Sequence, residues 1–261
     1  MTPSTPRIES GLNLPLAGYP ILSIGRDALG KLLDQRLKTQ QKTVLAFANT
    51  NLVMRCQHLR GWLCSQEVIL VNDGIGVDLA AYLQYGQMYQ ENLNGTDFIP
   101  YLLQTLQSPC RLFLFGGKPE VIGRAAEVIA RASHHAVVGF HDGYTPVQPA
   151  ELRRMINDSG ADVVLVGLGN PLQEAWVRDN LAGLQASLFI NVGALFDFLG
   201  QHVKRAPRWV QRIRCEWLYR FSQEPRRLAR RYTLDLLSFF ALCRRYPRWH
   251  IGNPAERQGP A

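Results

Sequence analysis

Short apolar runs alternate with stretches of helical spacing along most of the chain. A run of four to eight apolar residues is typical of a strand buried on both faces of a parallel sheet. Such runs predict strands at residues 43–48, 67–72, 111–115, 136–140, 162–167 and 187–192. Helical spacing predicts helices at residues 29–37, after 51 and ending near 59, at 76–85, at 95–106, from Pro119 onward and near 149–158. Because parallel strands need a crossover between them, this alternation indicates βαβ units. The predicted fold class is α/β: a Rossmann-like, doubly wound, mostly parallel sheet.

The pattern changes at both ends of this region. Residues 1–20 are rich in Pro, Gly and Ser and predict an irregular lead-in or a short edge element. After residue 200 no strand is expected, and residues 207–222 place aromatic side chains on one helical stripe surrounded by arginines. A second basic helix is expected after Pro225, ending in the apolar run 234–242. The predicted division is a Rossmann-like domain at 1–200, a basic helical appendage at 201–248 and a flexible tail at 249–261.

Composition places the chain among globular proteins. Of its 261 residues, 46% are hydrophobic and 19% are charged, which excludes a disordered chain. Five cysteines without C-x-x-C spacing argue against a disulfide framework and suit a reducing compartment. The first ten residues carry no apolar core of signal-peptide length, and no run of 18 apolar residues occurs. We therefore expect a cytoplasmic protein.

The net charge of +8 is concentrated near the carboxyl end. Residues 204–248 hold 13 Lys and Arg against three acidic residues, a net of +10, so the rest of the chain is close to neutral. This asymmetry favours a polyanionic partner for the appendage, either nucleic acid or an anionic membrane surface. The third alternative is that its aromatic side chains simply pack on the body. The apolar run 234–242 fits burial or bilayer contact better than nucleic acid, so the membrane is preferred.

The residues after the strand at 67–72 are the first candidates for chemistry. Asp73 follows the strand, and Gly74 and Gly76 lack side chains where a ligand could approach the backbone. In open α/β sheets the ligand crevice lies beyond the carboxyl ends of the strands. The alternative is that Asp73 merely caps the helix beginning near Gly76.

Three glycine-containing turns also follow predicted strands, at residues 116–117, 139–143 and 167–169. Such turns can bind phosphate through backbone N–H groups, although α/β folds need glycine there in any case. None matches a dinucleotide or P-loop fingerprint, so together they favour a nucleotide-type ligand only modestly. In the following segment, Asn170 as N-cap, Pro171 at N1 and Gln173 at N3 form a capping arrangement, and spacing alone favours that structural role.

Other chemistries are disfavoured by missing patterns. The six histidines include no H-x-x-x-H pair, there is no G-x-S-x-G elbow, and no carboxylate pair has D-x-D spacing. No metal and no cofactor are therefore expected, and sugar transfer, if it occurs, would proceed without a divalent ion.

Taken together, the order and spacing of many short pieces resemble the WecG/TagA/CpsF family of bacterial glycosyltransferases. The pieces in the body are Asn51, Asn72-Asp73-Gly74-Ile75-Gly76-Val77, Gly95-Thr96-Asp97, Leu114-Phe115-Gly116-Gly117, Gly143-Tyr144, Gly167-Leu168-Gly169-Asn170-Pro171-Leu172-Gln173-Glu174 and Gly193-Ala194-Leu195-Phe196-Asp197. Those in the appendage are Arg205-Ala206-Pro207, Glu216-Trp217-Leu218-Tyr219-Arg220, Glu224-Pro225-Arg226-Arg227 and Arg231-Tyr232. The resemblance spans about residues 44–232.

The resemblance implies an inverting, metal-independent glycosyltransferase of surface polysaccharide (exopolysaccharide) biosynthesis. It would move a hexose-type sugar from a UDP-sugar to a polyprenyl-diphosphate-linked saccharide at the inner face of the cytoplasmic membrane. Asp73 would be the general base, with Asn49 and Asn51 as further catalytic candidates. The residues implied in substrate binding are Gly116, Gly117, Gly143, Tyr144, Gly169, Pro171, Gln173, Glu174, Asp97, Arg220, Arg227 and Arg230.

The resemblance also bears on partners. It implies a peripheral contact with the anionic inner-membrane surface, no nucleic-acid partner, and is compatible with a homo-oligomer. The alternative function is a non-catalytic nucleotide- or nucleic-acid-binding Rossmann protein with a basic tail.

Two positions depart from the family pattern. The family commonly has T-x-N where this chain has Asn49-Thr50-Asn51, and commonly has arginine where this chain has Asn92. The donor sugars used in the family are N-acetylmannosamine, its uronic acid and glucose. Absence of the arginine disfavours the uronic acid, since one candidate partner for its carboxylate is missing.

Overall fold

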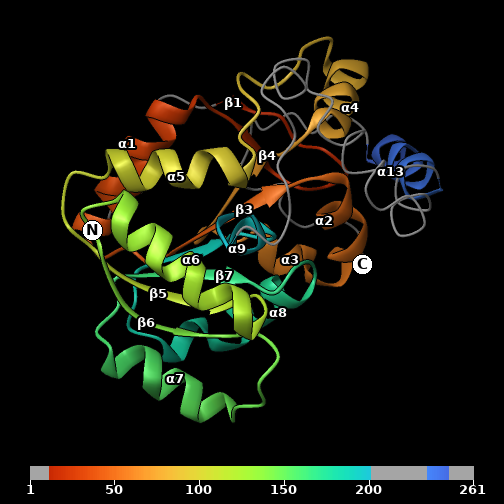
Figure 1. Cartoon of the computed structure of the whole chain (residues 1–261). Coiled ribbons are helices and arrows are strands. Elements are labelled where there is room, and N and C mark those ends of the chain that lie inside the picture. Colours follow the sequence, from red (N-terminus) through yellow and green to blue (C-terminus); the bar gives the residue numbers. More distant parts are fainter. Residues whose placement is uncertain (1–11, 201–233, 247–261) are drawn as a thin grey trace, which may run out of the picture.

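The computed structural model describes residues 12–200 and 234–246, which form one sheet covered by helices on both faces (Figure 1). The sheet order is β1-β2-β4-β3-β8-β7-β5-β6, and every described pairing is parallel except β1 with β2. The predicted α/β, doubly wound, mostly parallel architecture is confirmed. The strands are β1 (Leu12–Asn13), β2 (Ile21–Ser23), β3 (Thr43–Ala48), β4 (Val68–Asn72), β5 (Arg111–Gly116), β6 (Ala136–His141), β7 (Val163–Gly167) and β8 (Leu188–Asn191).

Strands β3 to β8 lie at the six predicted places, with boundaries that differ by one residue at most. The edge strand β1 agrees with the short edge element expected within residues 1–20, whereas β2 lies just beyond that range and pairs in parallel with β4 through Ile21 and Leu70. β2 has only three residues, all buried. A run that short, directly after Pro20, gives too little pattern to separate a strand from a turn.

The helices lie between successive strands, except for the last two described, which follow β8. They are α1 (Arg26–Lys38), α2 (Thr50–Arg55), α3 (Arg60–Leu63), α4 (Ile75–Tyr85), α5 (Gly95–Thr105), α6 (Pro119–Ala132), α7 (Pro149–Asp158), α8 (Leu172–Asn180), α9 (Leu195–Leu199) and α13 (Leu234–Arg245), with 3-10 turns at Gln57–Leu59 and Leu181–Gly183. The helix expected after residue 51 is broken into α2, a 3-10 turn and α3.

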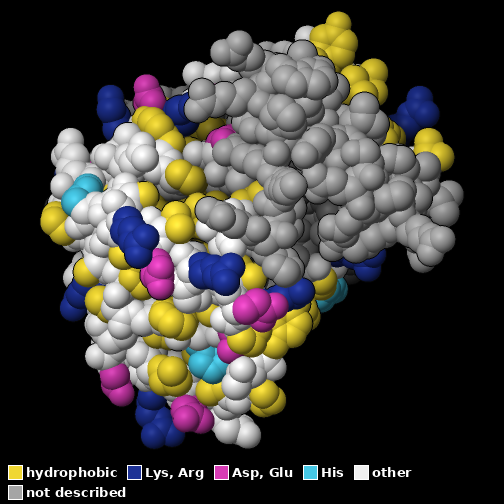
Figure 2. Space-filling view, viewed as in Figure 1, with side chains coloured by type: hydrophobic (Ala, Val, Ile, Leu, Met, Phe, Trp, Pro, Cys, Tyr) yellow, Lys and Arg dark blue, Asp and Glu magenta, His cyan; other side chains and the backbone are white. Residues whose placement is uncertain are grey.

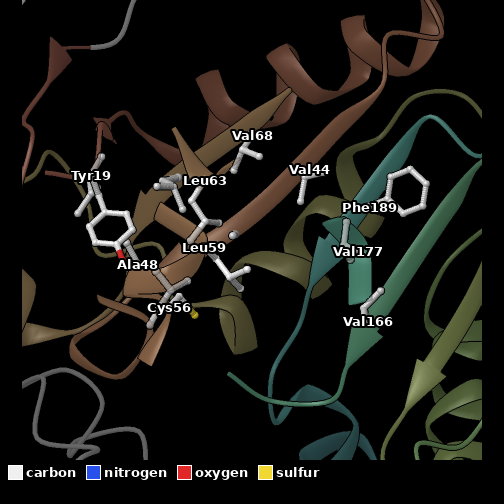
Figure 3. Packing of buried hydrophobic residues seen from close by; sticks show 14 of the residues in the cluster. Tyr19, Val44, Ala48, Cys56, Leu59, Leu63, Val68, Val166, Val177 and Phe189 are labelled. Carbon is white, nitrogen blue, oxygen red and sulfur yellow. The ribbon is translucent and has the colours of Figure 1, made fainter. Parts of the chain in front are cut away.

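Each face of the sheet carries its own hydrophobic core. Along β3, Val44 and Ala46 belong to one cluster and Leu45 and Phe47 to the other, as expected for side chains that alternate between faces. The first cluster is closed by α2, α4, α7, α8 and α13, and Figure 3 shows part of it around β3 and β8. The second is closed by α1, α5, α6 and α9.

The central strands β3 and β8 form a topological switch point. They are neighbours in the sheet, but α2 after β3 contributes Leu52 to the first core, whereas α9 after β8 contributes Phe196 to the second. Helices that leave adjacent strands toward opposite faces open a crevice between the strand ends, which is where ligands bind in such folds. The fold therefore directs attention to the carboxyl ends of β3 and β8.

Helix α13 is attached to this body. Its Phe239 is fully buried in the first core and Cys243 is nearly so, and the helix packs against α2 and α4. Just beyond it, the Arg60 guanidinium lies over the Tyr246 ring at 4.7 Å and donates to the Tyr246 hydroxyl. Of the alternatives left open for the run 234–242, the structure thus shows burial on the body. The basic helices expected at 207–222 and after Pro225 lie outside the described residues.

None of the helices within the described ranges is long and apolar enough to cross a membrane.

Replacing Phe239 with alanine tests the attachment of α13. We expect Phe239→Ala to lower the free energy of unfolding by about 3 kcal/mol, because it removes a buried ring and leaves a cavity. Leu237→Ala, on the same helix but 69% exposed, is the matched control and should change stability by less than about 0.5 kcal/mol. Chemical denaturation of the full chain measures both. Equal stability of the two variants would mean that α13 does not contribute to the core.

Candidate active site

Asp73 lies at the carboxyl end of β4 and is held from the neighbouring strand. Its backbone N–H donates to the carbonyl of Ala48, the last residue of β3, at 3.0 Å, and its side chain is half-buried. Helix α4 begins two residues later, after Gly74, with no side-chain cap. The interpretation of Asp73 as a helix cap is therefore wrong.

Asn49 joins the start of α2 to Asp73. Its Oδ1 accepts from the backbone N–H of Leu52 at 2.9 Å, which caps the helix, and its Nδ2 donates to Oδ2 of Asp73 at 2.9 Å. Because the oxygen is engaged at the helix, the amide can present only its NH2 group to the carboxylate. The amide at this position thus does what a threonine could do with one hydroxyl: it accepts from the helix N-terminus and donates to the aspartate.

Asn92, the second departure from the family pattern, contacts the backbone next to Asp73. Its Oδ1 accepts from the backbone N–H of Gly74 at 2.8 Å, directly after Asp73. Gly74 has φ +93°, a conformation that favours glycine. An arginine has no acceptor atom and could not make this bond. In this chain residue 92 therefore serves the backbone beside Asp73.

A second cluster of polar side chains lies where β7 leads into α8. The Asn170–Pro171 peptide bond is cis, and α8 begins at Leu172 without a side-chain cap. The predicted capping arrangement at Asn170 is therefore wrong. Instead, Asn170 Oδ1 accepts from Nδ2 of Asn51 at 3.0 Å, and its Nδ2 donates to Oε1 of Glu174 at 2.7 Å.

Glu174 is the centre of this group and is completely buried. Its Oε1 also accepts from Gln173 Nε2 at 2.8 Å and from Asn191 Nδ2 at 3.4 Å, and its Oε2 lies 3.6 Å from the Cys56 thiol. Burial raises the pKa of the Glu174 carboxyl above its ordinary value, although these hydrogen bonds act in the opposite direction. Burial, followed by the charge of Glu174, likewise raises the pKa of the Cys56 thiol.

Gln173 is buried as well and braces two turns. Its Oε1 accepts from the backbone N–H of Gly169 and of Gly193, each at 3.2 Å. Gly169, after β7, and Gly193, after β8, both have positive φ, and a Cβ at either would meet no atom within 4 Å. The hydrogen bonds of Gln173 therefore fix the shape of two turns that have open space beside them.

The glycines after β5 and β6 are required mainly by close backbone contact. Gly117 donates its N–H to the carbonyl of Gly167 at 3.0 Å, and Gly143 donates to the carbonyl of Gly117 at 2.9 Å. A Cβ on Gly116 would lie 2.4 Å from the oxygen of Gly167. These glycines therefore have the structural role that the sequence left open. Their backbone contacts join the turns after β5, β6 and β7 at one edge of the sheet.

Exposed apolar side chains flank these turns. Tyr144 is 68% exposed and Leu172 is 64% exposed. The backbone N–H of Tyr144 and that of Thr145 each donate to Oδ1 of Asp142 at 2.7 Å, so the carboxylate fixes the turn that presents Tyr144.

Of the remaining sequence candidates, only Asp97 falls within the described residues. Asp97 is exposed at the start of α5, where Asn94 caps the helix by accepting from the Asp97 N–H and donates to Oδ2 of Asp97 at 2.8 Å. Arg220, Arg227 and Arg230 lie outside the described residues. In the parts of the chain that are described, no group of three His, Cys, Asp or Glu side chains could hold a metal ion.

The structure adds two residues that sequence reasoning did not single out, Asn191 and Cys56. Asn191 is a buried amide that closes the apolar strand β8. A polar residue near the end of an apolar run was the available signal, and Asn72 at the end of β4 shows it too. Cys56 carried no such signal.

The sequence was also compared with models of protein families. It matches the model described as the glycosyl transferase WecG/TagA/CpsF family over residues 14–252. This match covers most of the chain and confirms the resemblance drawn from the motifs.

Replacing Glu174 with glutamine tests the buried carboxyl through the pH dependence of stability. A carboxyl with a raised pKa in the folded state contributes stability fully below its unfolded value, about 4.3, and this contribution is lost as the pH rises through the folded value. We therefore expect the stability of the native chain, relative to Glu174→Gln, to fall as the pH is raised from about 4 toward neutrality. Thermal unfolding of both proteins across this range measures it. A constant difference would mean that the carboxyl titrates alike in the folded and unfolded chains.

Proposed function

The chain belongs to the WecG/TagA/CpsF family of glycosyltransferases, which act in cell-surface polysaccharide biosynthesis, and on this premise we propose that it transfers a hexose from a UDP-sugar to a lipid-diphosphate-linked saccharide with inversion at the anomeric carbon. The observation that supports this proposal best is the placement of Asp73 at the carboxyl end of β4, oriented by Asn49.

In the proposed reaction Asp73 is the general base. Its carboxylate removes the proton from an acceptor hydroxyl while that oxygen forms a bond to the anomeric carbon of the donor sugar. The bond from this carbon to the diphosphate oxygen breaks, and UDP leaves with the electron pair. Asn49 fixes the carboxylate that must come within about 3 Å of the hydroxyl. Asn51 links this side of the crevice to Asn170.

The donor is proposed to lie along the turns after β5, β6, β7 and β8. Glycine turns let a ligand approach the backbone closely, because no side chain stands in the way. Gly116, Gly117, Gly143, Gly169 and Pro171 shape this edge, with Gln173 and Glu174 beneath it. Tyr144 is exposed beside the turns and is proposed to contact the nucleoside, and Asp97 to contact the sugar.

No divalent ion is included in the proposed mechanism. Charge on the departing diphosphate would be stabilised by Arg220, Arg227 and Arg230, which the family resemblance assigns to substrate binding. Arginine suits this role because its planar guanidinium binds phosphate bidentately and stays charged.

Among the family's donors, N-acetylmannosamine and glucose are favoured over the uronic acid, since Asn92 is occupied with Gly74.

A peripheral location on the inner face of the cytoplasmic membrane is proposed from the acceptor's lipid and from an apolar stripe on α4. Four side chains at helical spacing along α4 are exposed, although they are large and hydrophobic: Ile75, Leu79, Tyr82 and Leu83. Figure 2 shows one face of the molecule, with hydrophobic side chains in yellow. The stripe begins two residues after Asp73. Exposed apolar patches of this kind mark contacts with partners or lipid, so the polyprenyl chain is proposed to lie along α4 while its saccharide reaches the base.

Replacing Asp73 with asparagine tests the proposed base. The amide keeps the size of the side chain and can still accept from Asn49, but it cannot take a proton. We expect Asp73→Asn to lower kcat by at least about 100-fold, with the affinity for UDP changed less than about threefold. Initial-rate assays with a lipid-diphosphate saccharide and calorimetric titration of UDP measure the two quantities.

The matched control for this experiment is Asp158→Asn, an exposed carboxylate at the end of α7, which should leave both quantities unchanged. Turnover by Asp73→Asn at the native rate would remove Asp73 as the base.

Replacing two leucines of the α4 stripe tests the membrane contact. We expect Leu79→Gln/Leu83→Gln to lower the partitioning of the full chain onto phosphatidylglycerol vesicles by at least about tenfold, because two apolar side chains no longer enter the lipid. Vesicle sedimentation measures the bound fraction. Met155→Gln, at an exposed position on α7, is the control and should bind as the native chain does. Undiminished binding by the double variant would contradict the proposed role of α4.

A further inference from the structure

The buried carboxylate of Glu174 gathers neutral donors from four separate parts of the chain. Asn170 comes from the β7–α8 turn, Gln173 from α8 itself, Asn191 from the end of β8 and Cys56 from the end of α2. Glu174 is fully buried and the donors are three amides and a thiol. An ionised carboxylate accepts hydrogen bonds at both oxygens and donates none, so it suits a shell made only of donors.

The contact with Glu174 decides how the two neighbouring amides are oriented. A side-chain amide has a donor end and an acceptor end, and it can turn over at little cost in shape. Since Asn170 and Gln173 both direct NH2 groups to Oε1 of Glu174, their oxygens point the other way.

Those two oxygens hold the site together. The Asn170 oxygen accepts from Asn51 at 3.0 Å, which connects the β7 side of the crevice to α2. The Gln173 oxygen accepts from the N–H groups of Gly169 and Gly193. If the Gln173 amide turned over, its NH2 group would face two N–H donors, and both turns would lose their acceptor.

We propose that Glu174 is a positioning residue of the active site: it orients the amides of Gln173 and Asn170 and thereby holds the turns at Gly169 and Gly193 in the shape that receives the donor diphosphate. The role of the turns rests on the proposed function, whereas the orientation of the amides rests on the described contacts. Glu174 acts through its neighbours, because its side chain is enclosed and has no exposed surface with which to touch a substrate.

Three variants separate orientation from simple packing. Glu174→Leu fills similar space but accepts no hydrogen bond. Glu174→Gln keeps one oxygen for the amides and turns its NH2 group toward the Cys56 sulfur, so it should restore the orientation. Asn180→Leu removes a buried polar side chain from the same helix, where Asn180 accepts from Arg153 at 2.9 Å and donates to the Trp176 carbonyl at 2.8 Å. It is the matched control for a loss of stability away from the crevice.

Hydrogen exchange of the full chain, followed by mass spectrometry, tests the orientation directly. In Glu174→Leu we expect exchange at the turns around residues 169 and 193 to be at least about tenfold faster than in the native chain, because their N–H groups lose an acceptor. Glu174→Gln should exchange at the native rate in both turns, and so should Asn180→Leu. Native exchange rates at these turns in Glu174→Leu would overturn the proposal, as would the same acceleration in Asn180→Leu.

Titration with UDP tests the consequence for the site. We expect Glu174→Leu to bind UDP about tenfold more weakly than the native chain and to raise the KM for the donor similarly, while kcat falls less. Glu174→Gln should bind within about twofold of native. A native chain that binds no UDP would contradict the proposed function, and the exchange measurement would still decide the role of Glu174. Faster exchange at both turns with unchanged UDP affinity would overturn the part of the proposal that concerns the diphosphate.

Discussion

Where a parallel strand ends, its backbone leaves the hydrogen-bonded ladder, and the N–H groups of the following turn need new acceptors. In this protein side-chain amides supply them at four of the strand ends. Asn49 accepts from the start of α2, Asn92 from Gly74, and Gln173 from the turns after β7 and β8. Asn49 and Gln173 each also donate to a carboxylate, Asn49 to Asp73 and Gln173 to Glu174. The need to satisfy the turns therefore builds a polar cluster at the edge where a ligand can enter.

This constraint gives the two carboxylates different environments. Asp73 is half-buried and has an amide donor on one oxygen, whereas Glu174 is enclosed by donors on both oxygens. A partly exposed carboxylate can reach a substrate, whereas an enclosed one can only orient its neighbours. The sequence motifs indicate that both residues lie near the site. Their different roles depend on how deeply each side chain is buried, which cannot be read from the spacing of residues in the sequence.

The sheet could be predicted from the sequence because each buried strand is a continuous apolar run, and its order of helices and strands followed from the same pattern. Helix α7 was predicted at the residues where it occurs, since Pro149 opens it and its apolar spacing is regular. The start of α8 was not, because Asn170 and Pro171 are equally good capping residues and cis-turn residues, and only contacts with Asn51 and Glu174 distinguish the two. The catalytic candidate Asp73 was found from its place after a strand, whereas the network around Glu174 joins residues more than one hundred positions apart.

The double attachment of Asn49 limits which amino acids its position can accept. A side chain at this position must be short, and it must both accept a hydrogen bond from the α2 backbone and donate one to Asp73. Asparagine, serine and threonine meet both demands, but aspartate would place a second negative charge beside the first, and alanine would meet neither. Helix α13 packs on α2, so a displacement of that helix would also move the amide that orients the proposed base. The packing of α13 on α2 thus links the position of α13 to the side chain that contacts Asp73.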